Sequence, residues 1–136
     1  MATFENPSHS IARPSHPIDL SQDSAAVFPL RSMIEKLRRE DVYDRSSRNA
    51  VALIHDDGLR AVLTVAREGA ECGDHASPEP TLVINLAGRL AVRGADGGGA
   101  IELPEGSAAA LAPNVRHRLA AVTACAYLTI VGSRGA

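Results

Sequence analysis

The chain has 136 residues and a mass of 14.2 kDa, which fits one domain and leaves little room for a second. Hydrophobic residues make up 45% of it and charged residues 22%, so the chain can build a core and is not of the disordered class. The net charge of −2 and the aromatic content of 3% argue against nucleic acid as a partner, because the chain offers neither a basic surface nor stacking platforms.

The sequence also predicts a cytoplasmic protein without a membrane partner. No apolar run approaches the roughly 18 to 20 residues that a bilayer-spanning helix needs, and the N-terminal stretch Met1 to Pro17 lacks the apolar core of a signal peptide. The two cysteines, Cys72 and Cys125, are too few for the disulfide framework of a small secreted domain. We expect both to be reduced thiols.

Residues 1–27 form the first predicted segment, a flexible arm. It carries Pro7, Pro14 and Pro17 among polar residues, and its apolar content is too low to offset the entropy of ordering. An arm that crosses onto a partner subunit is the alternative. The remaining residues 28–132 are predicted to form a single domain.

An amphipathic helix is predicted over residues 29–41. Four apolar residues recur at the spacing of one helix face, and Glu35 lies four residues before Arg39 as a favourable ion pair. We expect the apolar stripe to pack against the core rather than to bind another protein. The four residues are Leu30, Met33, Ile34 and Leu37.

Short apolar runs separated by turns follow, which is the pattern of an all-β sandwich or barrel with one N-terminal helix. The Asp57-Gly58 pair predicts a hairpin between the first two runs. The last run is long enough for one strand or for two. The predicted strands cover residues 50–54, 59–66, 81–87, 89–93, 100–103 and 107–112, with the final apolar stretch at 120–131.

Two sets of residues in this region have characteristic spacings. The first runs Gly69, five residues, His75, one residue, Ser77, three residues, Thr81, six residues, Gly88. The second runs Gly106, five residues, Ala112-Pro113-Asn114, two residues, His117. These spacings resemble the two sequence motifs of the cupin family over about residues 29–132. The resemblance implies a cupin-type jelly-roll barrel or sandwich and a homodimer.

The resemblance also implies a divalent metal, but several family residues are replaced here. The second His of the first motif is Ser77 and its Glu is Thr81, so His75 and His117 are the family ligands that remain. Two imidazoles and a carboxylate suit Fe, Mn, Ni, Cu or Zn, and Glu79 is the candidate for that carboxylate. A metal completed by Glu79 and a metal-free site are both open.

Strand alternation predicts which side chains share the barrel interior. Ser77, Thr81 and Asn85 are expected to face inward with the two histidines and, together with Glu79, to contact a substrate. Asp74 and Cys72 have the opposite parity to His75 and are expected to point away, as are Arg116 and Arg118 on either side of His117. His55 is expected in a solvated turn. Asn114 is expected to tolerate a left-handed backbone in place of the family glycine.

The predicted function is that of a small-molecule enzyme. His75 and His117, as catalytic residues with or without a metal, would carry out lyase, isomerase, cyclase or oxygenase-type chemistry on a small organic substrate. The alternative is a non-catalytic cupin that binds or senses a small ligand in the same cavity.

Overall fold

The computed structural model describes residues 25–56, 58–75, 77–94 and 99–132, with residues 73–75 described by their backbone alone. Most of the predicted arm (residues 1–24) lies outside these ranges, so its flexibility stays a prediction. Within the described residues, no helix has the length and apolar character that crossing a membrane requires.

Two helices precede the strands. Helix α1 (Leu30–Arg39) confirms the predicted amphipathic helix, and it ends because the backbone at Glu40 is extended. Helix α2 (Asp41–Ser46) follows directly and was not predicted, because six residues are too few to show a helical period. It ends at Ser47, which adopts a left-handed φ of 65° and donates its backbone N–H to the carbonyl of Tyr43 at 3.0 Å.

The described residues form nine strands, two more than the apolar runs that sequence analysis separated. The strand at 71–75 was not among those runs, and the long final run divides into two strands around a turn at 122–124. The predicted hairpin is confirmed by paired backbone hydrogen bonds between Asp56 and Leu59. The strands are β1 (Arg48–His55), β2 (Leu59–Ala66), β3 (Glu71–His75), β4 (Thr81–Ala87), β5 (Leu90–Gly94), β6 (Ala100–Leu103), β7 (Ala108–Leu111), β8 (His117–Ala121) and β9 (Cys125–Gly132).

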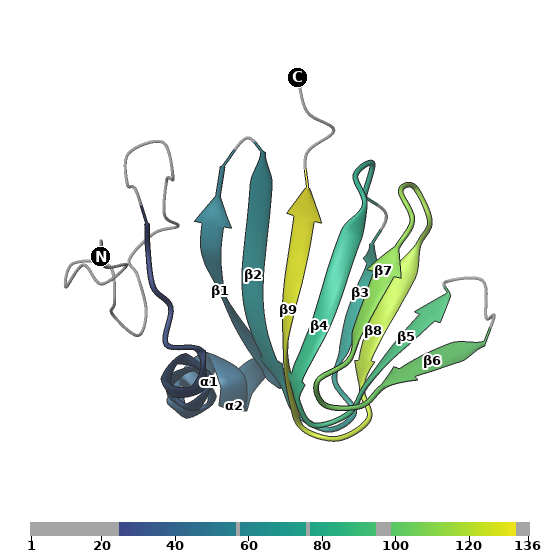
Figure 1. Cartoon of the computed structure of the whole chain (residues 1–136). Coiled ribbons are helices and arrows are strands. Elements are labelled where there is room, and N and C mark those ends of the chain that lie inside the picture. Colours follow the sequence, from purple (N-terminus) through teal and green to yellow (C-terminus); the bar gives the residue numbers. More distant parts are fainter. Residues whose placement is uncertain (1–24, 57, 76, 95–98, 133–136) are drawn as a thin grey trace.

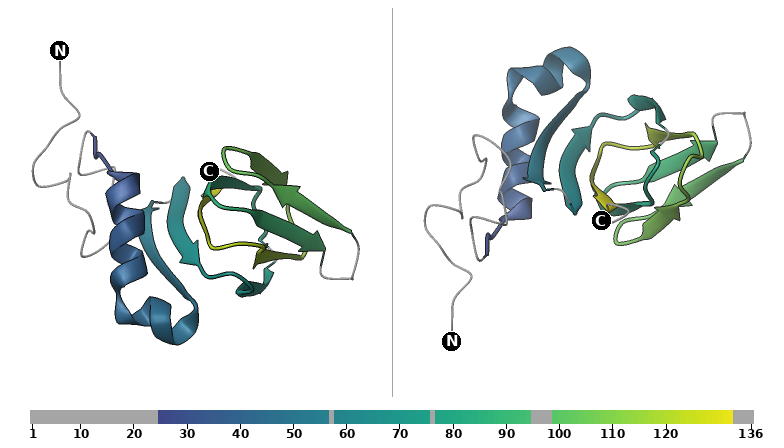
Figure 2. Two further views of the ribbon diagram at one scale, coloured as in Figure 1. Left: turned by 90° about the horizontal axis from the view of Figure 1, so that it is seen from below. Right: turned by 90° about the horizontal axis from the view of Figure 1, so that it is seen from above.

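The strands make two facing antiparallel sheets, which confirms the all-β jelly-roll prediction. One sheet has the order β1-β2-β9-β4-β7 and the other the order β3-β8-β5-β6. From β2 onward the chain passes repeatedly from one sheet to the other, so residues distant in sequence face one another across the interior (Figure 1). Views along the strands show the two layers, with the helices outside the five-stranded sheet (Figure 2).

The helices cover the outer face of β1 and β2. Met33 and Leu37 of α1 pack with Leu63 and Val65 of β2, and each of these side chains is at most 1% exposed. The stripe of α1 is therefore core packing, as predicted. Since these odd-numbered residues of β2 face the helices, the even-numbered residues face the opposite sheet.

Candidate functional site

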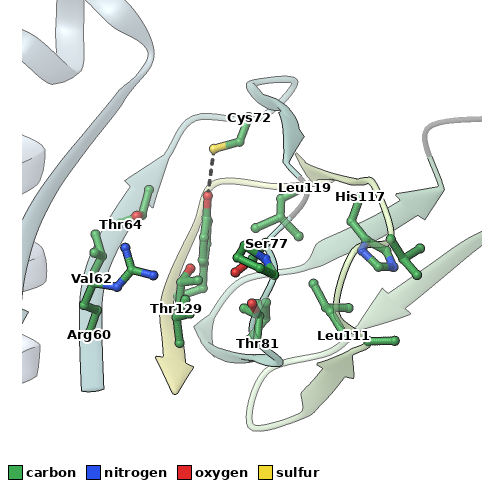
Figure 3. Close-up of a pocket in the computed structure, with 16 residues that line it drawn as sticks. Arg60, Val62, Thr64, Cys72, Ser77, Thr81, Leu111, His117, Leu119 and Thr129 are labelled. Atoms are coloured by element: carbon green, nitrogen blue, oxygen red, sulfur yellow. Dashed lines mark hydrogen bonds between the residues drawn. The ribbon is translucent and has the colours of Figure 1, made fainter. Parts of the chain in front are cut away.

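A cavity of about 470 Å³ lies between the two sheets. Its volume falls within the range of about 300 to 1,000 Å³ that is typical of small-molecule sites. Residues from strands of both sheets line it (Figure 3). The lining consists of Arg60, Val62, Thr64, Cys72, Ser77, Pro78, Thr81, Val83, Leu111, Ala112, Val115, His117, Leu119, Tyr127, Thr129 and Val131.

Strand register places the polar side chains of the five-stranded sheet at defined depths. Arg60 is paired with Val131, which is paired in turn with Thr81. One step deeper, Thr129 is paired with both Val62 and Val83. Deeper still, Thr64 is paired with Tyr127. The wall thus alternates hydroxyl groups with apolar side chains, which suits a ligand that has both polar and apolar groups.

Tyr127 closes the deep end of the cavity. Its hydroxyl lies 3.0 Å from the Sγ of Cys72, so a side chain of β9 in one sheet meets a side chain of β3 in the other. Tyr127 is 2% exposed, and burial raises the pKa of its phenol well above the usual value of 10. The phenol is therefore a neutral hydrogen-bonding group at physiological pH.

The position of Cys72 corrects the prediction from strand alternation. Cys72 was expected to point away from the interior, but it lines the cavity. Strand β3 carries an irregularity between residues 72 and 75: Cys72 is paired with Leu119, whereas His75 is paired with His117, so three steps on β3 match two on β8. Such a bulge shifts the alternation by one residue. Asp74 lies inside this irregularity, and its side chain is outside the described part.

The two motif histidines are opposite one another in the ladder between β3 and β8. The register pairs His75 with His117, so the two motif segments lie side by side. The His117 side chain lines the cavity wall near Leu111 and Leu119 (Figure 3). Within the described residues its imidazole makes no hydrogen bond or ion pair, so both ring nitrogens are available to a ligand. His75 is placed by its backbone alone.

Three more of the predicted residues cluster at the shallow end. Ser77 and Thr81 line the cavity as expected. Glu79 lies beside this lining: its Oε1 accepts a hydrogen bond from the Ser77 hydroxyl and another from the Arg60 Nη2, each at 3.3 Å. The Glu79 backbone N–H donates to the Ser77 Oγ at 3.1 Å, which fixes the loop. Glu79 is therefore already engaged with an arginine.

Asn85 is not part of the cavity lining. It has the inward parity that was predicted, but its register partner is Tyr127, at the deep end where the interior is filled. Its side chain is completely buried, and its Nδ2 donates to the carbonyls of Gly88 at 2.7 Å and Leu103 at 2.8 Å. The Asn85 Nδ2 thus holds the turn after β4 to the end of β6, while its buried Oδ1 has no hydrogen-bond partner among the described residues.

Backbone geometry explains why glycine or asparagine stands at four positions of the two motifs. Gly69, Gly88 and Gly106 all have positive φ values, between 76° and 86°. Asn114, in the place of the family glycine, has a φ of 64°, which confirms that it tolerates a left-handed backbone. Its backbone N–H donates to the Ser77 carbonyl at 2.7 Å and so joins the two motif segments beside the cavity.

The described side chains do not by themselves make up a metal site. Within the described side chains, no group of three or more His, Cys, Asp or Glu lies close enough together to hold an ion. Ser77 and Thr81, which stand at ligand positions of the family motif, offer neutral hydroxyls, and the Glu79 carboxylate is paired with Arg60. Among the described side chains His117 is thus the one family ligand at the cavity, whereas known sites use three or four such ligands; His75 and Asp74 are placed by their backbone alone.

Besides Cys72, four lining residues with polar side chains were not predicted: Arg60, Thr64, Tyr127 and Thr129. In the sequence these residues are polar and lie on one face of two otherwise apolar strands, β2 and β9. This pattern was ambiguous, because a surface strand also has one polar and one apolar face. The structure resolves the ambiguity: the helices pack against the apolar face of the five-stranded sheet, so its polar face lies toward the cavity.

The chain matches no protein-family model and no curated protein. Solved structures do resemble it. A cupin superfamily protein of Desulfitobacterium hafniense is 17% identical, with a TM-score of 0.65 over 89% of this chain and 97% of that one. A conserved protein of unknown function from Streptococcus pyogenes is 23% identical, with a TM-score of 0.61 over 68% and 79%.

A third neighbour names the architecture. The RmlC-like cupin family protein of Methanocaldococcus jannaschii, described as a double-stranded β-helix, is 13% identical, with a TM-score of 0.59 over 65% of this chain and 82% of that one. At these identities the likeness establishes the fold. The chain has the cupin fold, as the motif spacings predicted.

Proposed function

We propose that the chain is a small-molecule enzyme, in which His117 and His75 move protons on a substrate held between the two sheets. The observation that carries this proposal is the 470 Å³ cavity, in which the His117 imidazole makes no hydrogen bond to any described residue. His117 is half-buried in the cavity wall, so its ring nitrogens can meet a ligand that enters the cavity. A concave, mostly apolar site with a few polar groups is typical of small-molecule binding.

The side chains suggest how the chemistry is divided. An imidazole can take up or release a proton near neutral pH, and two imidazoles on opposite ladder positions supply one base and one acid. The hydroxyls of Ser77, Thr81 and Thr129 would orient a carbonyl or hydroxyl of the substrate. Apolar side chains around them exclude water. The reactions that need only these groups are eliminations, isomerisations and cyclisations.

The proposed chemistry is independent of a metal, because Ser77 and Thr81 replace two family ligands and Glu79 is paired with Arg60. Metal content per chain, measured by mass spectrometry on tag-free protein, tests this point. We expect no stoichiometric metal after reconstitution with Fe, Mn, Ni, Cu or Zn. One metal per chain that disappears in both His75→Ala and His117→Ala would overturn metal independence and direct the assays to oxygenase-type chemistry.

Activity is tested with substrates found by a ligand screen. Compounds that raise the melting temperature of the chain are incubated with it, and product formation is followed by NMR. We expect turnover to fall by about 100-fold or more in His117→Gln and in His75→Gln, since general acid–base catalysis contributes on that scale. His55→Gln is the matched control, because His55 is exposed at the end of β1, and it should retain full activity.

Two outcomes would contradict catalysis. Full turnover in both histidine variants would remove the histidines from the mechanism. Tight binding without any turnover would support the alternative of a non-catalytic binding or sensing cupin in the same cavity. We further propose a homodimer, supported by an exposed apolar surface on β4 and β7 that includes Leu82 and Ala110. The cytoplasmic location stays a prediction.

A further inference from the structure

One residue brings a permanent charge to the described lining of the cavity. Arg60 is the only permanently charged side chain among the described residues that line it, and the remaining lining is apolar or carries neutral hydroxyl, thiol or imidazole groups. A guanidinium at the edge of a mostly apolar cavity attracts a ligand group of opposite charge. An anionic group is therefore favoured at one point of the cavity wall.

That point lies at the shallow end. Arg60 is four residues from Thr64, the partner of Tyr127 at the deep end, and its side chain is 50% exposed. Figure 3 shows the guanidinium beside Val62, on the side of the strand that faces Thr129. A ligand that meets Arg60 at the opening can extend inward along the apolar wall toward His117.

The Arg60 guanidinium also has N–H donors that are not used within the described residues. Its single ion pair within the described residues joins Nη2 to the Glu79 Oε1 at 3.3 Å. A guanidinium carries five N–H donors in a planar fork that matches both oxygens of a carboxylate. Because Glu79 is held by Ser77, it fixes the guanidinium through one nitrogen and leaves the rest of the fork for a second carboxylate.

We infer that the substrate is a small carboxylic acid whose carboxylate is bound by Arg60 and whose apolar part lies against Val62, Val83 and Leu119. This inference rests on the proposed function of the cavity and specifies its substrate class. A bidentate pair with arginine fixes the direction of the acid as well as its position. With the carboxylate at the opening, the rest of the molecule is presented to the His117 wall.

Matched pairs of a carboxylate and its primary amide test the inference directly. Isovalerate, isocaproate and benzoate are each titrated beside isovaleramide, isocaproamide and benzamide into the isotope-labelled chain at pH 7, and affinities are taken from the NMR shifts. We expect each carboxylate to bind at least about tenfold more tightly than its amide, as a charge-assisted fork contact implies. Arg60→Gln should remove this preference while the amides bind as before.

Arg89→Gln is the matched control. Arg89 is also half exposed and also pairs with a carboxylate, that of Glu102 at 2.8 Å, but it lies outside the cavity lining. It should keep the full preference for carboxylates. Arg60→Lys should keep part of it, because a lysine retains the charge and loses the fork.

Three results would overturn the inference: equal binding of acids and amides, a preference that survives in Arg60→Gln, or no binding of any of the three acids. Each is distinct from a failure of the proposed function. If neutral compounds are turned over with dependence on His117, the enzyme proposal stands without the carboxylate. If acids bind through Arg60 and nothing is turned over, the carboxylate site stands without catalysis.

Discussion

Among the glycines whose surroundings the structure describes, Gly88 has the least room for a side chain. It has a φ of 76°, and a Cβ placed on it would lie 2.0 Å from the backbone oxygen of Ala124. The left-handed conformation alone costs a non-glycine residue about 1 to 2 kcal/mol. The contact adds more, because a backbone oxygen in the turn before β9 cannot rotate away as a side chain can.

Gly88→Ala is therefore expected to lower the free energy of unfolding by at least about 3 kcal/mol, from backbone strain and overpacking together. Urea unfolding measures the loss. Gly106→Ala is the control: its φ is 86°, but nothing lies within 4 Å of the added Cβ, so about 1 to 2 kcal/mol is expected. Equal losses in the two variants would show that the contact with Ala124 contributes nothing.

Cys125 makes stability depend on pH in the alkaline range. Its thiol is completely buried, and burial raises its pKa from 9.0 to about 11. The folded chain therefore keeps a proton that the unfolded chain loses near pH 9. The free energy of unfolding should fall as pH rises from 9 to 11, by about 1.4 kcal/mol per pH unit for this one group.

Cys125→Ala isolates this contribution. Between pH 9 and 10 its unfolding free energy should stay nearly constant, whereas that of the parent falls. Above pH 10 a decline should remain in both proteins, because the pKa of the buried Tyr127 is also raised and its phenol loses stabilisation in the same direction. Urea unfolding at stepped pH values is the measurement, and an unchanged slope in Cys125→Ala would refute the assignment.

At the scale of single elements, the attachment of α1 to β1 depends on one buried amide. Asn49 of β1 donates from Nδ2 to the carbonyl of Leu37 at 3.0 Å and to the Glu40 Oε1 at 2.8 Å. These bonds tie the end of α1 to the strand on which it packs. Since the same helix covers the apolar face of β2, Asn49 also supports the wall that presents Arg60 and Thr64 to the cavity.

Asn49→Ala should destabilise the chain by about 1 to 3 kcal/mol, because buried polar partners lose their hydrogen bonds. The urea midpoint should fall without a change in the m-value, which would show that the same surface is exposed on unfolding. Ser32→Ala, which removes an exposed hydrogen bond to Pro29 on the same helix, should cost at most about 0.5 kcal/mol. Similar losses in the two variants would contradict this role for Asn49.

The elements also show where sequence reasoning succeeds and where it stops. The ranges of β2, β4 and β6 follow from apolar runs and turn residues, which are local signals. The position of Cys72 does not, because a bulge between residues 72 and 75 changes its face. Asn85 has the predicted parity, but its depth depends on register with a distant strand. Local sequence patterns predict which face of a strand a side chain lies on. Its depth in the interior depends on the register with neighbouring strands, which the local pattern does not contain.

For the whole molecule, the same reasoning explains why several polar residues of the cavity wall were missed. The motif residues Ser77, Thr81 and His117 were found because the spacing of two family motifs marks them. Arg60 and Thr129 belong to neither motif. Their inward position follows only once the helices are seen to occupy the other face of the sheet, a tertiary fact that depends on where residues 30–46 pack.

One apolar surface of the five-stranded sheet remains beside the helices. Leu82 and Ile84 of β4 lie on the opposite face to the cavity-lining Thr81 and Val83, and register places them next to Ala110 and Ala108 of the edge strand β7. Leu82 is 38% exposed, and both alanines are exposed. An apolar patch beside an open sheet edge favours association, and a second copy of the chain would cover both features.

We therefore expect a homodimer, with a mass of about twice 14.2 kDa by size exclusion with light scattering. Leu82→Glu should shift it to the monomer, because dimerisation would then bury an unpaired charge. Ile101→Glu is the matched control, since Ile101 is 64% exposed on β6 of the other sheet and should leave the dimer intact. A monomeric parent would contradict the homodimer, and a dimeric Leu82→Glu variant would place its interface elsewhere on the molecule.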